Sequence, residues 1–324
     1  MPRTRVYREG THLPDDLSVA QACELVGTPD TVVWIDIGPA DQTELETLNK
    51  RLDLHALGVR DALRAQPRSS FVHYPQHDFL STGALRFDPR AGTVALSPIA
   101  VFLTADLMLT VRADDDFPVD EVVAHWDAEE DELGRHGVGF LLHGLLEQTV
   151  QSHFEAVRAL DETLDDLEDQ MFDSAGGDMA LQRRSHQLRK AVIRLHRLTL
   201  PTQDALESLT ETADCLLAPE LAPYLGNVRD HATRVGEWIL SLRDTVATIL
   251  QTQLSLHDSR MTVISKRVTG WAALIAIPAL VTGFYGINVP FPGMGKQWGF
   301  VTFLAVLAGL FGILYAVFKR KDWL

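Results

Sequence analysis

A short neutral segment near the C-terminus carries the residues best suited to chemistry. It reads GFYGINVPFPG, from Gly283 to Gly293, and holds three glycines, two prolines, one asparagine and no charged side chain. The amide of Asn288 offers a neutral carbonyl that can contact the water shell of a hydrated cation. Mg²⁺ dehydrates reluctantly and keeps several waters when bound, so neutral oxygens around a pore are a suitable filter for it. A Gly-x-Asn tripeptide is common, and only its location gives it weight.

That location is the gap between two long apolar runs. Val268–Gly295 and Trp298–Phe318 contain no Asp, Glu, Lys or Arg. About 20 apolar residues in a helix cross roughly 30 Å of hydrocarbon. A pair of buried core helices is the alternative, which two such runs in tandem at a chain end disfavour. Irregular backbone at membrane depth is tolerated where it is buried in protein or lines water, and small residues such as Gly283 and Gly286 suit it.

Charges beside these runs predict their orientation. Lys266 and Arg267 precede the first run, a basic cluster from Lys319 to Lys321 follows the second, and the link carries only Lys296. The positive-inside rule therefore places both termini in the cytoplasm. The N-terminus MPRTRVYREG has no apolar stretch behind it, so no signal peptide is expected.

The composition limits the classes of ligand and of activity to be expected. The net charge of −15 disfavours nucleic acid and favours cations, and two cysteines are too few for a disulfide framework. No nucleophile elbow, phosphate-binding glycine loop or Cys-x-x-Cys is present, so an enzyme is not expected. The histidine pairs His136/His143 and His73/His77 lack a third ligand at matching spacing and are interpreted as ordinary surface or core residues. The acidic run Leu160–Asp169 could collect cations, but a solvated helix face explains it better.

The elements that position the neutral segment begin with a mixed α/β region up to about Arg112. Thr31–Ile37 is a predicted buried strand, and a helix with apolar residues at helical spacing follows Asp41, its expected cap. Further strands are expected in residues 69–88 and 93–112. Helices are then expected over Phe117–Gly134, Gly139–Gln170 and from about Asp178 to Leu209.

A seven-residue apolar repeat follows Pro223. It predicts a helix packed along a seam, and its members are Val228, Val235, Leu242, Ile249, Leu256 and Val263. The expected companion positions are His231, Trp238, Thr245, Thr252 and Ser259, which are mixed and partly polar. Either the helix packs on its own domain, or it forms a stalk around an axis shared between subunits. Continued into the first apolar run, about 60 residues would give a helix near 90 Å long.

The segment YGIN (Tyr285–Asn288), the two apolar runs and the ending KRKDWL together resemble the CorA family of divalent-cation transporters, whose signature is Gly-Met-Asn. The stretch Trp34–Leu63 is similar to the family's cytosolic segment. The resemblance implies a homopentamer with an α/β cytosolic funnel of mixed sheet and helices, followed by a stalk helix and a two-helix membrane hairpin. It also implies a filter at Tyr285, Gly286, Ile287 and Asn288, and a pore face at Ala279, Ala276, Ala272, Val268 and Ser265. A basic collar would comprise Lys266, Arg267, Lys319, Arg320 and Lys321.

Three departures from the family pattern bear on which metal the protein transports. Ile287 replaces the signature's Met, as in the zinc-transporting ZntB branch, and the loop VPFPGMGKQW lacks an acidic pair. The pore threonine expected after the helix proline is Ala279, with Thr282 one turn away. These changes weaken the transfer of magnesium selectivity but leave the transporter assignment intact.

We therefore expect a transporter of the inner membrane that moves Mg²⁺, and also Co²⁺ or Ni²⁺, with lipids and its own copies as partners. Mg²⁺ is also expected as a regulatory ligand, with Asp230 and Leu160–Asp169 as sensor candidates. A zinc transporter, driven by protons, is the first alternative, and a membrane-anchored coiled-coil sensor that moves no ion is the second. The expected segments are a cytosolic domain (1–222), a stalk (223–267), a first span (268–288), an external loop (289–297), a second span (298–318) and a basic tail (319–324).

Overall fold

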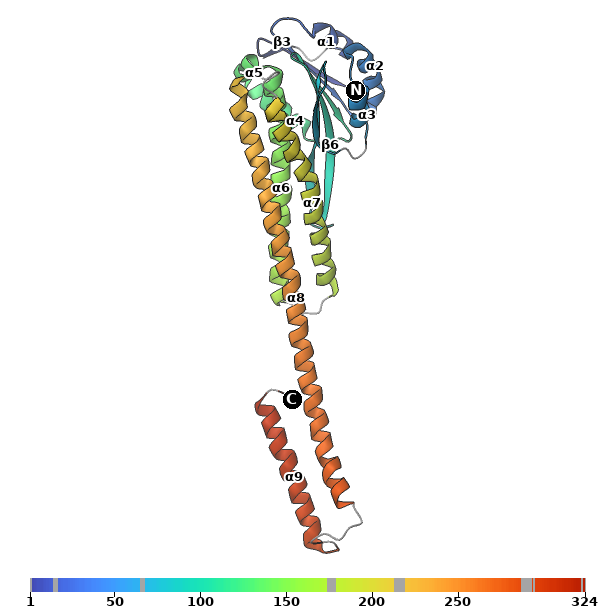
Figure 1. The fold of residues 1–324 in the computed structure, drawn as a ribbon, viewed down its shortest axis with the longest axis vertical. Helices are drawn as coiled ribbons and strands as arrows, with labels where there is room; N and C mark the ends of the chain where they lie inside the picture. Colours follow the sequence, from blue (N-terminus) through green and yellow to red (C-terminus); the bar gives the residue numbers. More distant parts are fainter. Residues whose placement is uncertain are drawn as a thin grey trace. The chain divides into compact units, whose positions relative to one another are not determined.

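The computed structural model describes residues 2–13, 17–64, 68–173, 179–212, 219–286, 293, 295–321 and 323. These residues divide into two compact units, the first ending at residue 249 and the second beginning at residue 250. Each unit is described by itself. Figure 1 labels the elements of both.

The first unit is built on a seven-stranded mixed sheet with the order β2-β1-β3-β7-β6-β5-β4. Only β3 and β7 pair in parallel among its described strands, and the other neighbours are antiparallel. The predicted mixed sheet is therefore confirmed, with an added N-terminal strand β1 that the sequence analysis did not assign. The strands are β1 (Arg3–Arg8), β2 (Thr11–His12), β3 (Thr31–Ile37), β4 (Ser70–His73), β5 (Asp78–Asp88), β6 (Thr93–Leu103) and β7 (Leu107–Arg112).

Strand β3 shows why this sheet needs helices on both faces. Val33, Ile35 and Ile37 belong to one buried apolar cluster, whereas Trp34 belongs to another. Successive side chains of a strand point to opposite faces, so a strand with large apolar side chains on both faces must be covered on both. Trp34 packs edge-on against Trp126, with ring centroids 5.0 Å apart.

Helices pack on both faces of the sheet. On one face lie α1 (Val19–Leu25), α2 (Gln42–Leu52) and α3 (Ala56–Ala62), and on the other lie α4 (Val119–Ala128), α5 (Glu130–His136), α6 (Val138–Asp173) and α7 (Met179–Thr212), as Figure 1 shows. Asp41 occupies the N-cap position of α2, but its side chain makes no capping hydrogen bond. The single helix predicted over Phe117–Gly134 is wrong: two helices meet at Glu129, whose φ of −126° and ψ of 50° are not helical.

Helix α8 (Ala222–Tyr285) begins in the first unit and ends in the second. Its buried residues within the first unit repeat at alternating spacings of three and four, namely Leu225, Val228, Ala232, Val235, Ile239, Leu242, Val246 and Ile249. The predicted members up to Ile249 are confirmed as one half of this seam. The companion positions chosen from the sequence are wrong, because the buried partners lie four residues after each member rather than three. His231 is exposed, for example, whereas Ala232 is buried.

The seam of the first unit is covered by its own domain. Trp238 Nε1 donates a hydrogen bond to Asp161 Oδ2 on α6 at 3.1 Å, and Gln203 Nε2 on α7 donates to the carbonyl of Ala232 at 2.6 Å. The interpretation of one helix packed on its own domain therefore describes α8 up to Ile249.

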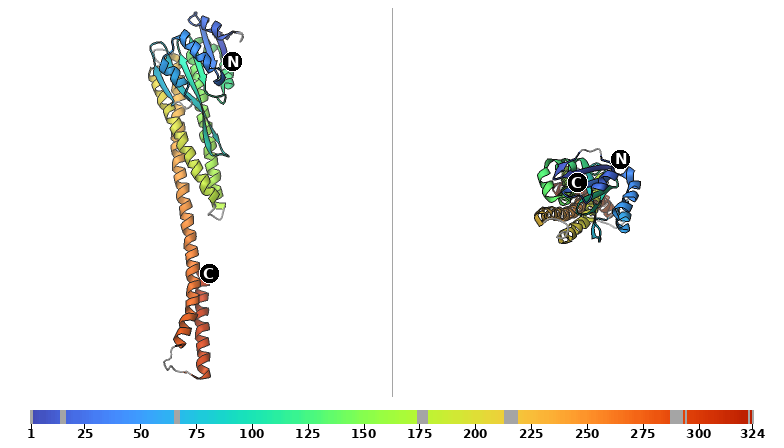
Figure 2. Two further views of the ribbon diagram at one scale, coloured as in Figure 1. Left: turned by 90° about the vertical axis from the view of Figure 1, so that its right-hand side faces the viewer. Right: turned by 90° about the horizontal axis from the view of Figure 1, so that it is seen from above.

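The second unit is a pair of helices. It contains the rest of α8 and the apolar helix α9 (Gln297–Arg320), and Figures 1 and 2 show the two side by side. Both α8 and α9 are long and apolar enough to cross a membrane by length and composition. A mixed sheet with helices, a long helix and a C-terminal apolar helix make up the predicted fold.

Candidate functional site

The predicted pore face forms one exposed stripe on α8. Its members, Ser265, Val268, Ala272, Ala276 and Ala279, are separated by three, four, four and three residues and are all exposed. That spacing keeps side chains on one side of a helix. A stripe of this kind is available to line a shared axis, and its role in lining a pore stays a prediction.

The buried residues of the same stretch lie on the opposite side of the helix. Gly270, Leu274 and Val281 are buried, with Leu274 only 2% exposed. At about 100° per residue, these positions are rotated by close to 180° from Ala272. Helix α9 therefore leaves the predicted pore face uncovered.

Pro278 interrupts the hydrogen bonding of α8 without ending the helix. Proline has no backbone N–H, so the carbonyl of Leu274 loses its helical donor. Thr282 Oγ1 lies 2.8 Å from the carbonyl of Pro278 and 3.1 Å from that of Ala279, to which it donates. A hydroxyl that donates its hydrogen keeps its lone pairs for an incoming donor. Thr282 is exposed and can therefore offer an oxygen to a water of a hydrated cation.

The signature segment begins where α8 ends. Tyr285 is the last residue of the helix, and the backbone N–H of Gly286 donates to the carbonyl of Thr282 at 2.9 Å. A Cβ at Gly286 would lie 3.2 Å from that carbonyl oxygen, so the position favours a residue without a side chain. Ile287 and Asn288 lie outside the described residues.

The residues of the predicted basic collar are exposed at one end of the helix pair. Lys266 and Arg267 are exposed on α8, and Lys319, Arg320 and Lys321 are exposed at the end of α9. The Lys319 ammonium lies 5.9 Å from the centre of the Tyr315 ring. Basic residues flanking an apolar helix, with an aromatic beside them, are typical of a membrane interface.

The two sensor candidates lie in the first unit. Asp230 is exposed on α8, with an oxygen 3.4 Å from Arg229 Nη2. In the run Leu160–Asp169, the leucines at 160, 164 and 167 are buried, whereas Asp165, Asp166 and Asp169 are exposed. Burial raises the pKa of Asp161, which accepts the hydrogen bond from Trp238. Most of this acidic run is thus the outer face of an amphipathic helix.

The predicted histidine pairs have other surroundings. His73 Nδ1 lies 2.6 Å from Asp78 Oδ1, and the buried ring of His77 packs on Phe102 with centroids 5.5 Å apart. His136 Nε2 lies 3.3 Å from Glu132 Oε2. The interpretation of these pairs as ordinary surface and core histidines fits these contacts, with His143 the exception treated below.

The α/β unit is followed by a long helix and two apolar helices with basic residues at their flanks, an arrangement that indicates a membrane transport protein. The family described as CorA-like Mg²⁺ transporter protein matches residues 29–320. The chain belongs to this family.

Individual relatives agree on metal transport but name different metals. The cobalt/magnesium transport protein CorA of Thermotoga maritima is 24% identical over 91% of this chain and 84% of its own. The zinc transport protein ZntB of Pectobacterium atrosepticum is 25% identical over 90% of this chain and 88% of its own. The complete structure of the CorA magnesium transporter from Methanocaldococcus jannaschii superimposes with a TM-score of 0.79, covering 100% of this chain and 99% of that one at 20% identity.

Proposed function

We propose that this protein is a divalent-cation transporter of the inner membrane, that it works as a homopentamer with both termini in the cytoplasm, and that Mg²⁺ is its leading substrate. Membership of the CorA-like family over residues 29–320 carries the proposal. Co²⁺ and Ni²⁺ are secondary substrates. The protein is a transporter and not an enzyme.

The surface of the second unit supports a membrane assembly of several copies. Many large apolar side chains are exposed on a single chain, including Leu280 at 75%, Ile275 at 70% and Ile313 at 66%. Exposed apolar surface of this extent indicates contact with lipid or protein. The stripe from Ser265 to Ala279 has small or moderate side chains, which suits a water-filled axis between copies of α8.

The membrane potential would drive uptake. A negative interior is worth about 2.3 kcal/mol per charge per 100 mV, hence about twice that for a divalent cation. In this mechanism the Asn288 amide contacts the waters of the hydrated ion, and the exposed oxygen of Thr282 on α8 contacts waters of the ion further along its path. Neutral oxygens can bind the ion weakly enough to release it.

Feedback by the transported metal is part of the proposal. Mg²⁺ bound preferentially to a closed state would shift the population toward that state when the internal metal is plentiful. Asp230 and the exposed carboxylates of Leu160–Asp169 are the proposed sensors.

Zinc is the second candidate substrate, and specific residues favour it. Ile287 stands where magnesium-type members carry Met, the loop before Lys296 has no acid, and a zinc transport protein is among the relatives. A zinc transporter of this kind would draw on a proton gradient.

Flux into proteoliposomes loaded with metal-sensitive dyes tests the proposal. Uptake of Mg²⁺, Zn²⁺, Co²⁺ and Ni²⁺ is measured with and without a pH gradient, for wild type, Asn288→Ala and the matched control Asn227→Ala, an exposed position of α8 in the first unit. We expect Mg²⁺ uptake that needs no pH gradient, a strong loss for Asn288→Ala and none for the control. Zinc uptake that requires a proton gradient, without any Mg²⁺ uptake, would show that Zn²⁺ and not Mg²⁺ is the substrate. If Asn288→Ala transports metal as fast as the wild type, Asn288 is not part of a filter. If no metal is transported at all, the alternative of a sensor that moves no ion is favoured.

A further inference from the structure

A group of metal-binding side chains lies in the first unit, on the helices that cover the sheet. His125 comes from α4, and His143 and Glu147 come from α6, one turn apart on the same face. One ligand atom from each residue lies within 4.8 Å of the other two. Among the described residues, this is the only group of three or more His, Cys, Asp or Glu side chains that meets so closely.

Each of the two histidines has a buried ring nitrogen without a hydrogen-bond partner among the described residues. His143 is 7% exposed, and its Nδ1 has no hydrogen-bond partner among the described residues. His125 Nε2 is likewise buried without one. A buried polar atom that has lost water without gaining a partner costs free energy, so each such atom in a native protein needs an explanation.

An ion pair between His125 and Glu147 accounts for the closeness of two of the three side chains. His125 Nε2 lies 3.8 Å from Glu147 Oε2, within ion-pair distance and beyond hydrogen-bond distance. That pair does not include His143, whose buried Nδ1 has no hydrogen-bond partner among the described residues. A metal ion placed between the three side chains would take one ligand atom from each of them.

Neighbouring residues hold both imidazole rings in place. The Phe140 ring stacks on His125 and on His143, with centroid distances of 5.8 and 6.3 Å, and Tyr224 of α8 meets His143 edge-on at 5.5 Å. Gly144 lets α4 approach α6, because a Cβ there would lie 3.2 Å from His125 Cδ2. The rings are thus fixed before any ligand arrives, which favours binding.

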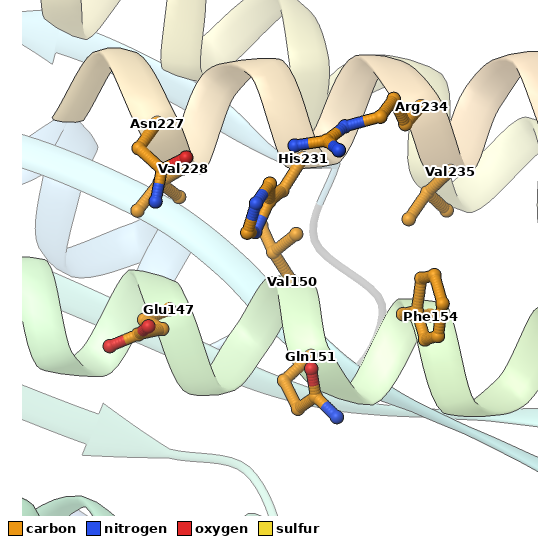
Figure 3. Close-up of a pocket in the computed structure, with 9 residues that line it drawn as sticks. All are labelled: Glu147, Val150, Gln151, Phe154, Asn227, Val228, His231, Arg234 and Val235. Atoms are coloured by element: carbon orange, nitrogen blue, oxygen red, sulfur yellow. The ribbon is translucent and has the colours of Figure 1, made fainter. Parts of the chain in front are cut away.

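Solvent reaches the group through the carboxylate. The Glu147 side chain is 50% exposed and that of His125 is 36% exposed. Glu147 also lines a cavity of about 250 Å³ between α6 and α8, shown in Figure 3 with the polar side chains of Asn227, His231 and Arg234. An ion and a bound water can therefore enter without unfolding the unit.

We propose that His125, His143 and Glu147 form a binding site for a transition-metal dication of the Zn²⁺ type within the first unit. Two imidazoles and a carboxylate suit Zn²⁺, whereas Mg²⁺ prefers oxygen ligands. Bonds of about 2.0 Å in a tetrahedron place ligand atoms about 3.3 Å apart, so the 3.8 Å between His125 and Glu147 needs only a small side-chain movement. A water completes the fourth position. The site is separate from the proposed pore and does not depend on which metal the pore carries.

Co²⁺ is the probe for the test, because it replaces Zn²⁺ and its visible absorption reports tetrahedral coordination. The full-length protein in detergent is titrated with Co²⁺ and then with Zn²⁺ or excess Mg²⁺ as competitor. We expect one tetrahedral Co²⁺ per chain, displaced by Zn²⁺ and not by Mg²⁺. Loss of an outer partner of a metal ligand already weakens binding about 10- to 100-fold, so loss of a ligand in His125→Gln, His143→Gln or Glu147→Gln is expected to weaken it by at least tenfold.

Matched variants separate this site from other effects. His186→Gln removes an exposed histidine of α7, and Asn288→Ala alters the proposed filter, so both are expected to keep the Co²⁺ spectrum. Glu147→Gln changes a half-exposed side chain and guards against misfolding as the cause of a loss. A spectrum that survives in His125→Gln and Glu147→Gln, or disappears in Asn288→Ala, would overturn the proposal. Failure of transport in the flux assay would leave it untouched.

Discussion

The stability of the first unit should depend on one buried histidine. His153 on α6 is 1% exposed, and its Nε2 lies 2.9 Å from the carbonyl of Gly83 on β5. Because a carbonyl only accepts, Nε2 carries the hydrogen and Nδ1 is the atom that would be protonated. That atom has no partner among the described residues. Burial lowers the pKa of His153 to about 4.

The sign of the effect follows from the two pKa values. An unfolded histidine has a pKa of about 6.5, so between that value and the folded pKa the unfolded chain binds more protons. The stabilising contribution is fully present above the unfolded pKa and is lost as the pH falls. A difference of about 2.5 pKa units corresponds to about 3 kcal/mol in total, of which about 2 kcal/mol is lost between about pH 7 and pH 5.

His153→Gln isolates this contribution, because the glutamine amide can still donate to Gly83 but does not titrate. The full-length protein in detergent is unfolded in urea at each pH, and pulse proteolysis reports the unfolded fraction of the first unit. We expect the wild type to lose about 2 kcal/mol more than the variant over this pH range. Equal pH dependence in both proteins would refute the assignment of a buried neutral histidine.

Four further substitutions probe the same unit with the same assay. Asp36→Ala removes the 1%-exposed carboxylate that pairs at 2.9 Å with Arg112, whose side chain is 13% exposed, and should cost about 3–5 kcal/mol. Arg86→Ala, from an exposed pair, should cost under about 1 kcal/mol. An equal cost for both would contradict the role of burial. Gly83→Ala places a Cβ 2.5 Å from the Ser97 carbonyl and should destabilise by about 1–3 kcal/mol. Gly226→Ala in α8 meets nothing within 4 Å and should stabilise by up to about 1 kcal/mol; a loss there would show that α8 is not helical at this position.

The sequence predicted the elements whose composition matches their burial. Strand Thr31–Ile37 is β-branched or aromatic at every position except Asp36, and the structure buries it on both faces. The N-terminal strand was missed because RTRVYR carries three arginines, and the sequence does not show that Arg3 and Arg5 pair with Asp120 and Asp127 of α4. Local composition does not reveal such distant partners.

The seam of α8 shows where periodicity stops being informative. Every seventh residue from Val228 to Ile249 is buried as predicted, whereas Val263 of the same row is 44% exposed. The heptad spacing alone leaves open whether the second row follows three or four residues later. The polar row containing His231 was chosen, although the apolar alternative containing Ala232 and Ile239 was the better match to a buried stripe. An apolar count of both rows would have found it.

The sequence predicts one of the two candidate sites better than the other. The spacing of Ser265–Ala279 predicts a single helix face, and the structure places these residues on one exposed stripe. The histidine group was not predicted: of its three members only His143 was noted, paired with His136 and interpreted as an ordinary surface or core residue. The third ligand required the packing of α4 on α6, which brings His125 to a residue 18 positions away in the chain.

The buried seam of α8 also has a consequence for biosynthesis. The core of the first unit includes residues up to Ile249, and only 18 residues separate it from the first apolar run, which begins at Val268. At a synthesis rate of about 5–20 residues per second, these 18 residues take about 1–4 s to translate. The α/β unit can therefore complete its core only as its first membrane span is being made, so its folding and the membrane insertion of α8 must proceed within the same few seconds on the ribosome.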